Sequence, residues 1–257
     1  MHVQVEMSFI KKKMSLTGLT ESLSKLTTSG SSKYAEPISP AEDDADEGIV
    51  YKRELKTKAK YPMRVDLSDK DEKLSAPLDF VGAGLRSEKI IGIEFWIYTI
   101  GLYAESAKLK EHLKAYAKCE SGTLHENKDF CNALVDMKNV TRVLRFVITL
   151  PGLKAGIVVA QFDKVLLPKM KERGKEDNYN YIMENMGKAK FKKGTVMFLA
   201  LSGDGTVSCI CDGELLGSVC CETLCQAIME IYFGDTPISK DVKEKICNGI
   251  HESVQEE

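Results

Sequence analysis

The last third of the chain contains three strand-like runs joined by very short turns. The runs 195–201 and 206–211 flank Ser202-Gly-Asp-Gly205, and Asp212-Gly213 separates the second run from a third at 214–219. An Asp-Gly dipeptide between two such runs is a strong signal for a tight hairpin. We therefore expect consecutive antiparallel strands here, because parallel neighbours need a much longer crossover connection.

Helices follow these hairpins as a separate group. Residues 222–233 carry apolar side chains at helical spacing and precede Gly234, a residue common just after the end of a helix. Ser239 is a suitable N-cap for a last helix that continues to Ile250. Hairpins and helices that are segregated along the chain predict an α+β fold and argue against a doubly wound α/β fold.

The middle of the chain predicts further elements of both kinds. Residues 49–67 fit one or two short strands, and residues 89–103 are apolar at both parities, which predicts one strand covered on both faces. A strand is expected over 142–150, ended by Pro151. The apolar residues that follow recur near a 3.6-residue period, so we expect a helix there that Pro168 bends or ends.

The first 47 residues differ in composition from the rest. Residues 8–33 are rich in serine, threonine and lysine with a single acid, Glu21, and an acidic run follows at 42–47. Such a segment buries too little apolar surface to offset the entropy lost on ordering. We expect residues 1–47 to be a disordered or targeting segment, similar to a transit peptide except that it lacks arginine. Residues 48–257 are expected to form one domain.

Charge and hydropathy argue against two classes of partner. The 36 basic and 38 acidic side chains give a net charge of −2, so we expect no basic surface for nucleic acid. No apolar run reaches the roughly 18–20 residues that a membrane span requires. The hydrophobic fraction of 43% is sufficient for a sizeable core.

Eight cysteines are present, and Cys220, Cys221 and Cys225 form the one dense group. No Cys-x-x-Cys occurs and the histidines lie far from this group, so reduced buried thiols are expected in preference to a metal site. We expect neither a metal nor another cofactor. The chain shows no hydrophobic signal peptide, which favours a reducing compartment.

Gly82-Ala-Gly84 could be mistaken for part of a dinucleotide-binding fingerprint. The third glycine of that motif would fall at position 87, where a serine stands, and the next segment predicts a strand in place of the required helix. We therefore interpret the two glycines as a flexible turn that leads to Arg86.

Arg86 is the candidate binding residue, and two interpretations are open. It is either an arginine at the rim of the fold with an ordinary ion-pair partner, or a fixed cation at the end of an apolar pocket, where its planar fork suits a carboxylate. Tyr98 lies twelve residues later, so in one uninterrupted strand the two side chains would share a face, although Gly92 could break this parity. The phenol of Tyr98 would then donate to the same anion, or it is simply a half-buried tyrosine.

Four segments resemble the chalcone isomerase superfamily. They are Gly82-Ala-Gly-Leu-Arg86, Tyr98-Thr-Ile-Gly-Leu-Tyr103, Phe198 with the Gly203-Asp-Gly205 turn, and an ending from Leu224 to Ser239. The resemblance spans about residues 74–250, and it implies an open-faced antiparallel β-sandwich with helices packed on one face of the large sheet. The family contains isomerases that cyclise chalcones to flavanones, plastid fatty-acid-binding proteins, and helper proteins of flavonoid synthesis.

The resemblance also assigns roles to single residues. Arg86 matches the family's anion-binding arginine. Tyr98 stands where true isomerases have a threonine, and a tyrosine at this position is similar to the fatty-acid-binding branch. Ser218 lies near the position of a substrate-contacting threonine. The Tyr, Lys and Asn group that true isomerases carry after a Leu-Pro dipeptide is not matched, since only Lys154 and Lys164 fit, and with shifted spacing.

The segment after that dipeptide is instead apolar, with Ile157, Val158, Val159 and Phe162. Such a wall suits an acyl chain, because each buried methylene contributes ~0.8 kcal/mol. We expect a protein without catalytic residues that binds a fatty acid or similar amphipathic carboxylate through Arg86, Tyr98 and Ser218, in a plastid or otherwise in the cytoplasm. Two alternatives stay open: a chalcone-flavanone isomerase (an intramolecular lyase), and a non-catalytic helper that binds another enzyme.

Overall fold

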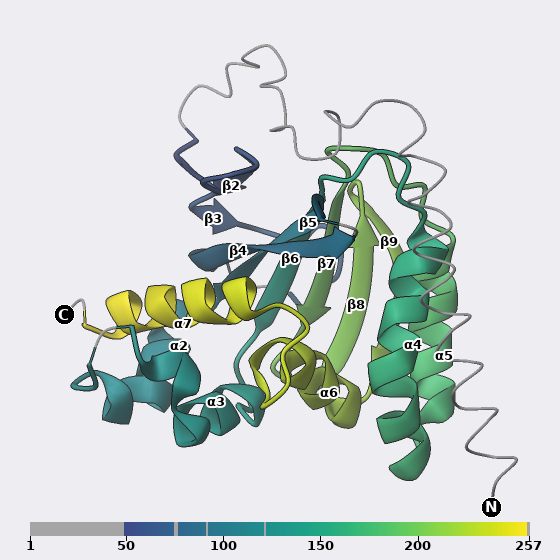
Figure 1. Ribbon diagram of the computed structural model, residues 1–257. Coiled ribbons are helices and arrows are strands. Elements are labelled where there is room, and N and C mark those ends of the chain that lie inside the picture. Colours follow the sequence, from purple (N-terminus) through teal and green to yellow (C-terminus); the bar gives the residue numbers. More distant parts are fainter. Residues whose placement is uncertain (1–48, 75–76, 91, 121, 256–257) are drawn as a thin grey trace, which may run out of the picture.

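An antiparallel sheet of seven strands forms the centre of the molecule (Figure 1). The computed structural model describes residues 49–74, 77–90, 92–120 and 122–255. The segment expected to be disordered or targeting, residues 1–47, lies outside the described residues. Within them the α+β class expected from the hairpins and the separate helices is confirmed.

The sheet is a meander in which each strand pairs with the next one along the chain, in the order β3-β4-β5-β6-β7-β8-β9. Tight turns enforce this order: Asp212 and Gly213 both have positive φ, 46° and 84°, as a two-residue hairpin turn between right-twisted strands requires. β1 and β2 form a separate two-stranded sheet. The strands are β1 (Tyr51–Arg53), β2 (Lys60–Pro62), β3 (Arg64–Val65), β4 (Leu78–Ile90), β5 (Ile93–Ala104), β6 (Arg142–Ile148), β7 (Val196–Leu201), β8 (Thr206–Cys211) and β9 (Glu214–Cys220).

The helices cover one face of this sheet, which we call the helix face. They include the two helices expected at the end of the chain and the one expected after Pro151. Ser239 caps the last helix as expected, because its Oγ accepts from the backbone N–H of Val242 at 3.3 Å. The helices are α2 (Ser106–Leu113), α3 (Lys128–Val135), α4 (Ala155–Glu172), α5 (Glu176–Gly187), α6 (Glu222–Phe233) and α7 (Lys240–Gln255).

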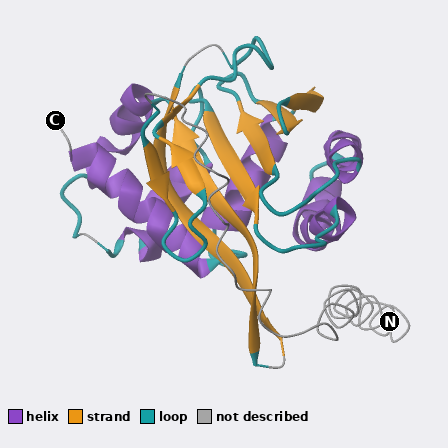
Figure 2. Cartoon of the chain, turned by 90° about the horizontal axis from the view of Figure 1, so that it is seen from above, coloured by secondary structure: helices purple, strands orange, loops and turns teal. Residues whose placement is uncertain are grey.

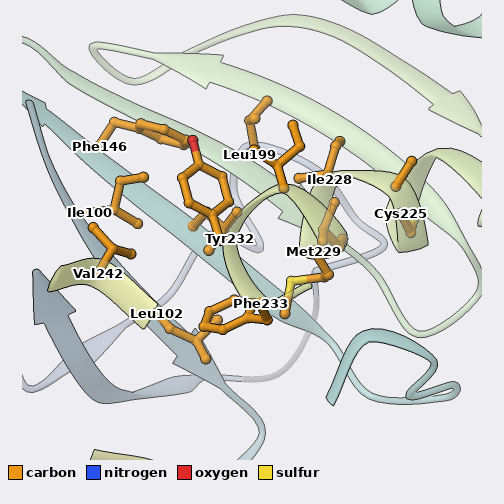
Figure 3. Close-up of a cluster of buried hydrophobic side chains, with 14 of the residues drawn as sticks. Ile100, Leu102, Phe146, Leu199, Cys225, Ile228, Met229, Tyr232, Phe233 and Val242 are labelled. Carbon is orange, nitrogen blue, oxygen red and sulfur yellow. The ribbon is translucent and has the colours of Figure 1, made fainter. Parts of the chain in front are cut away.

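Strand alternation divides the buried residues between the two faces of the sheet. On β5 and β6 the even-numbered residues, such as Ile100 and Phe146, point into the large core beneath the helices. Figure 3 shows this core around α6, where Tyr232 and Phe233 lie against the sheet residues. The odd-numbered Tyr103 and other residues of the opposite side form a smaller core.

The opposite side of the sheet, which we call the open face, carries no helix among the described residues. The β1–β2 hairpin and the loop after β3 cover part of it, and they bury Tyr61, Leu67 and Leu74 against the sheet. A large sheet covered by helices on one side and by short strands and loops on the other is the open-faced sandwich that the resemblance implied.

Two expectations about the first half of the sheet were wrong. Residues 89–103 do not form one strand, because Gly92, with φ of 80°, lies in the turn between β4 and β5. The outer part of this hairpin extends past the other strands (Figure 2). Gly82 and Gly84 do not form a turn either but lie inside β4. They are small because α7 packs directly on them: a Cβ at Gly84 would lie 2.5 Å from the Cα of Val242.

Pro168 lies inside α4 and does not end it. α3 and α5 were not expected from the sequence, and they add further apolar residues to the core of the helix face. Among the described residues, no helix combines the length and the hydropathy needed to cross a membrane.

Candidate functional site

Arg86 and Tyr98 lie side by side on the helix face. They are cross-strand partners in the β4–β5 hairpin, and directly opposed residues of an antiparallel pair point to the same side of the sheet. The guanidinium carbon of Arg86 lies 6.0 Å from the centre of the Tyr98 ring. The sequence predicted that the two side chains share a face because of an even spacing along one strand. In the structure they share a face because the chain reverses at Gly92 and places them opposite each other on two strands.

The guanidinium of Arg86 is almost fully buried, with 4% of the residue exposed. Nη1 donates to the carbonyl of Ile238, and Nη2 donates to Oε1 of Glu88 at 2.8 Å. The Glu88 side chain is itself 42% exposed. Arg86 is therefore a buried cation whose only acidic partner among the described residues is partly exposed at the surface.

The segment before α7 is held in place by contacts to β4. The backbone N–H of Leu85 donates to Oδ2 of Asp241 at 2.7 Å, and the hydroxyl of Ser239 donates to the carbonyl of Leu85 at 3.1 Å. These bonds fix the first turn of α7 on the strand. Ile238, which directly precedes Ser239, is thereby positioned so that its carbonyl meets Arg86.

Two phenols meet next to the guanidinium. The hydroxyl of Tyr98 lies 3.4 Å from that of Tyr232 on α6. Phe146 packs edge-on against both rings, with centroid distances of 5.5 Å to Tyr98 and 6.3 Å to Tyr232. Figure 3 shows Phe146 beside Tyr232. Burial raises the pKa of Tyr98 against the opposing effects of Arg86 and of the Tyr232 hydrogen bond, and burial together with Tyr98 raises the pKa of Tyr232. Both phenols are therefore neutral near pH 7 and able to donate.

The wall beside Arg86 and Tyr98 is mostly apolar. It is formed by Ile97 of β5, Leu153 and the first turns of α4, where Ile157 and Val158 face the site and Gln161 adds one amide. The cavity enclosed there measures about 10 Å³. This is about the space of one water molecule, so α4 closes the site against the sheet.

Lys154 and Lys164 lie at the surface and not in the apolar wall. Lys154 is exposed at the residue that precedes α4, and Lys164 is exposed two turns into the helix. Partial burial and the charge of Arg86 lower the pKa of Lys164, while Glu88 opposes this. Lys164 thus contributes positive potential near Arg86 but does not contact the phenols.

Ser218 is not brought together with Arg86 and Tyr98. It is the cross-strand partner of Ser208, and their hydroxyls are 3.0 Å apart. Ser208 donates to Oδ2 of Asp71 at 2.6 Å, and Ile210, two residues further along β8, belongs to the core of the open face. Ser218 therefore lies on the opposite side of the sheet from the guanidinium.

Tyr232 was missed as a site residue. In the sequence it lies within the segment from Leu224 to Ser239 that resembles the family, but no role was assigned to it there. Its position four residues after Ile228 on the apolar stripe of α6 indicates a helix side chain that faces the sheet. Nothing in that spacing predicts that its hydroxyl would meet the phenol of Tyr98, which belongs to a strand 134 residues away.

The dense group of cysteines forms no metal site in the structure. All eight cysteines are free, and no group of three or more His, Cys, Asp or Glu side chains suited to a metal occurs among the described residues. Burial raises the pKa of Cys225 to about 12, which keeps this thiol protonated.

Comparisons with known proteins agree with the fold. Fatty-acid-binding protein 2 of Arabidopsis thaliana is 27% identical over 173 residues, which are 65% of this chain and 43% of that protein. This match thus spans less than half of that relative's length. Fatty-acid-binding protein 1 of the same plant is 24% identical over 78% of this chain and 69% of its own length. Chalcone isomerase-like protein 1 of Humulus lupulus is 27% identical over 63% of this chain and 77% of that protein.

The crystal structure of an Arabidopsis thaliana fatty-acid-binding protein superposes with a TM-score of 0.63 at 20% identity, and the alignment covers 80% of this chain and 99% of that one. This likeness shows the fold. The profile of the chalcone isomerase-like family matches residues 59–247, which contain Arg86, Tyr98 and Tyr232. The chain belongs to the chalcone isomerase-like family.

Proposed function

We propose that this protein binds a fatty acid or a similar amphipathic carboxylate and does not catalyse a reaction. The carboxylate head group would meet Arg86, Tyr98 and Tyr232, and the acyl chain would lie between β5 and α4. Ser218 is not part of this site, because it lies on the open face. The observation that carries the proposal is a buried guanidinium next to two neutral phenols at the end of an apolar wall.

The head-group site supplies what a carboxylate requires. A buried guanidinium stays charged and offers several N–H donors in one plane. Turning Glu88 into solvent frees Nη2 of Arg86 for the incoming anion. The 3.4 Å contact between the phenols is long for an O–H···O hydrogen bond, so redirecting one hydroxyl to a carboxylate loses little.

The acyl chain requires α4 to move. The closed cavity of about 10 Å³ holds no methylene chain, so binding must separate the first turns of α4 from Ile97 and Leu153. The free-energy cost of this separation is offset by burial of the acyl chain, since each buried methylene contributes ~0.8 kcal/mol. Long chains should therefore bind and short ones should not, because only the former bury enough apolar surface to open the wall.

The names of the relatives support binding over catalysis. Two of them are called fatty-acid-binding proteins. Cyclisation of a chalcone requires a held phenolate and a polarised ketone, and hence several polar groups in fixed positions. Here the wall that would face such a substrate is built from Leu153, Ile157 and Val158.

The test starts with the lipid that the protein carries. Native mass spectrometry of freshly purified protein should show a bound carboxylic acid, and delipidated protein should bind a long saturated fatty acid at least tenfold more tightly than the primary alcohol of the same chain length. Equal affinity for acid and alcohol would contradict the head-group assignment. Turnover of a chalcone clearly above the spontaneous rate would contradict the non-catalytic role.

A plastid location is part of the proposal. It rests on the resemblance to plastid fatty-acid-binding proteins and on the composition of residues 8–33, which lie outside the described residues. A fluorescent fusion of the full chain should enter plastids, and the same fusion without residues 1–47 should stay in the cytoplasm. Equal distribution of both fusions would contradict a targeting role for this segment.

A further inference from the structure

Positive charge is concentrated in the β1–β2 hairpin and the residues beside it. Residues 49–64 contain six basic side chains and one acidic side chain, Glu54, although the whole chain has a net charge of −2. The Glu54 side chain is only 1% exposed, so the accessible charge of this segment is positive. The basic residues are Lys52, Arg53, Lys56, Lys58, Lys60 and Arg64.

Most of these cations are not neutralised by a neighbouring acid. Lys56 pairs with Glu94 at 3.7 Å, and Arg64 pairs with Asp79 at 2.8 Å. The other four have no ion-pair partner in the part of the chain that the structure describes. Such a group of cations attracts a partner that carries negative charge.

Apolar side chains are exposed on the same segment. Of the seven large hydrophobic side chains that are exposed among the described residues, four lie here, and Leu55 is 75% exposed. The backbone N–H of Met63 donates to the carbonyl of Val50 at 2.9 Å, which places these two residues together. Exposed apolar side chains that are grouped and bordered by polar ones mark an interaction surface. The four residues are Ile49, Val50, Leu55 and Met63.

A hollow beside the hairpin brings the basic and the apolar side chains onto one surface. Its volume is about 580 Å³, and it lies between the hairpin, β4 and α7. Leu55 and Met63 line it together with Lys52, Arg53 and the ring of Phe80. A partner that fits this surface must therefore present both negative charge and an apolar part.

The tip of the hairpin is held in a fixed shape. Oε2 of Glu54 accepts from the backbone N–H of Lys56 at 3.1 Å, and from the backbone N–H and the hydroxyl of Thr57 at 2.7 Å and 2.8 Å. Oε1 of Glu54 lies 3.3 Å from Nζ of Lys245 on α7. Leu55 is thus exposed on a preformed turn, and little further ordering is needed when it binds a partner.

We propose that the β1–β2 hairpin docks this protein on a membrane surface that contains anionic lipids. Leu55 and Met63 enter the boundary between head groups and acyl chains, while Lys52, Arg53 and Lys58 meet the lipid phosphates. Peripheral membrane binding uses this combination, because the burial of apolar side chains and the attraction of basic ones to anionic head groups act together.

The proposed membrane contact is separate from the carboxylate site. The hairpin packs on the open face through Tyr61, whereas Arg86 and Tyr98 lie on the helix face. Variants of the hairpin surface should therefore keep the fatty-acid affinity of the free protein, and a failure of one proposal leaves the other in place.

Flotation of the full chain with lipid vesicles tests the docking. Vesicles of phosphatidylcholine with about one third phosphatidylserine should bind at least about tenfold more protein than vesicles of phosphatidylcholine alone. Added salt should release the protein, because salt screens the charges. Equal binding to both kinds of vesicle, or none to either, would overturn the proposal.

A pair of double variants tests the basic side chains. Lys52→Gln with Lys58→Gln should weaken binding to the anionic vesicles by roughly 20- to 30-fold, since each basic residue near such a surface contributes about fivefold. Lys128→Gln with Lys138→Gln is the matched control, because both lysines are exposed beside α3, far from the hairpin (Figure 1). Both double variants change the net charge equally, so equal losses of binding would contradict docking through the hairpin.

A pair of leucine variants tests the apolar part. Leu55→Ser should weaken vesicle binding by about tenfold and leave urea unfolding unchanged, because the side chain is exposed. Leu215→Ser on β9 removes another exposed leucine, at the opposite edge of the sheet, and should bind as the wild type does. A dimer in analytical ultracentrifugation that Leu55→Ser dissociates, without vesicle binding by the wild type, would assign this surface to a second copy of the chain and overturn the proposal.

Discussion

The two faces of the sheet carry the same kinds of side chain but arrange them differently. On the helix face, Arg86 lies 6.0 Å from the ring of Tyr98. On the open face, Arg145 lies 5.0 Å from the ring of Tyr61 and 5.9 Å from that of Phe198. Both arginines therefore stack against a tyrosine, and the residue types alone do not tell which face could hold a ligand.

The difference lies in how replaceable the partners are. Tyr61 donates to Oγ1 of Thr99 at 2.6 Å, and Nη1 of Arg145 donates to the carbonyl of Lys60 at 3.0 Å, so the polar groups of the open face hold the β1–β2 hairpin on the sheet. On the helix face the phenols have only a 3.4 Å contact with each other, and Arg86 pairs with a carboxylate at the surface. A binding site requires polar groups whose present partners can leave, and the long contact between the phenols and the exposed partner of Arg86 provide such groups on the helix face.

The largest effect is expected from two glycines that allow close contacts on opposite faces. A Cβ at Gly84 would lie 2.5 Å from the Cα of Val242, whereas one at Gly101 would lie 2.5 Å from the ring of Tyr61. Gly84→Ala must displace the backbone of α7 and should lower the free energy of unfolding by about 3 kcal/mol, while Gly101→Ala displaces a side chain and should lower it by roughly 1–2 kcal/mol.

Urea unfolding measures both values, and fatty-acid titration adds a second comparison. Gly84→Ala should also weaken binding because α7 follows Ile238, which holds Arg86, and Gly101→Ala should leave affinity unchanged. Equal losses of affinity in the two variants would show that the helix face is not the binding face.

The two arginines themselves form the next pair. Arg86→Ala removes the cation that faces the proposed carboxylate and should weaken fatty-acid binding by about 2–3 kcal/mol, or roughly 30- to 150-fold. Arg145→Ala should change affinity less than about twofold but lower the free energy of unfolding by roughly 1 kcal/mol, because it loses the ring contacts of the open face. Isothermal titration and urea unfolding of both variants check this, and unchanged affinity in Arg86→Ala would remove the basis of the proposed site.

The elements that the sequence predicted well are those whose signals are local. The Asp212-Gly213 turn and the apolar stripe of α6 each lie within a dozen residues, and both appear where expected. The Gly92 turn was hidden because Ile90 and Ile93 on either side of it are apolar, so the segment looked like one strand.

The site depended on contacts that sequence spacing does not contain. The two glycines before Arg86 were interpreted as a turn. They are instead required by the close packing of α7, which is about 160 residues further along the chain. Ser218 was placed by resemblance, and only the pairing of β9 with β8 shows that it points to the open face. Arg86 and Tyr98 did share a face, but through a hairpin and not through one strand.

The two tyrosines provide a finer test. Tyr98→Phe removes one proposed donor to the carboxylate and should weaken fatty-acid binding by about 1 kcal/mol, or roughly fivefold. Tyr61→Phe breaks the bond to Thr99 and should lower the free energy of unfolding by about 1 kcal/mol without a change in affinity. The same titrations and urea curves measure both, and the opposite assignment of the two effects would place the ligand on the open face.

The smallest expected effect comes from the acidic partner of Arg86, and it has the opposite sign. Glu88 must give up Nη2 when a carboxylate arrives, so Glu88→Gln removes a competitor and a like charge and should tighten binding by about two- to fivefold. Glu94→Gln is the matched control, since Glu94 lies on the same hairpin and is similarly exposed, but it accepts from Ser87 and pairs with Lys56.

Both variants change the net charge equally, so a general electrostatic effect would tighten fatty-acid binding in both. Tightening in Glu88→Gln alone would show that the ligand competes for the bond between Glu88 and Arg86, and weaker binding in that variant would mean that Glu88 supports the arginine in the bound state.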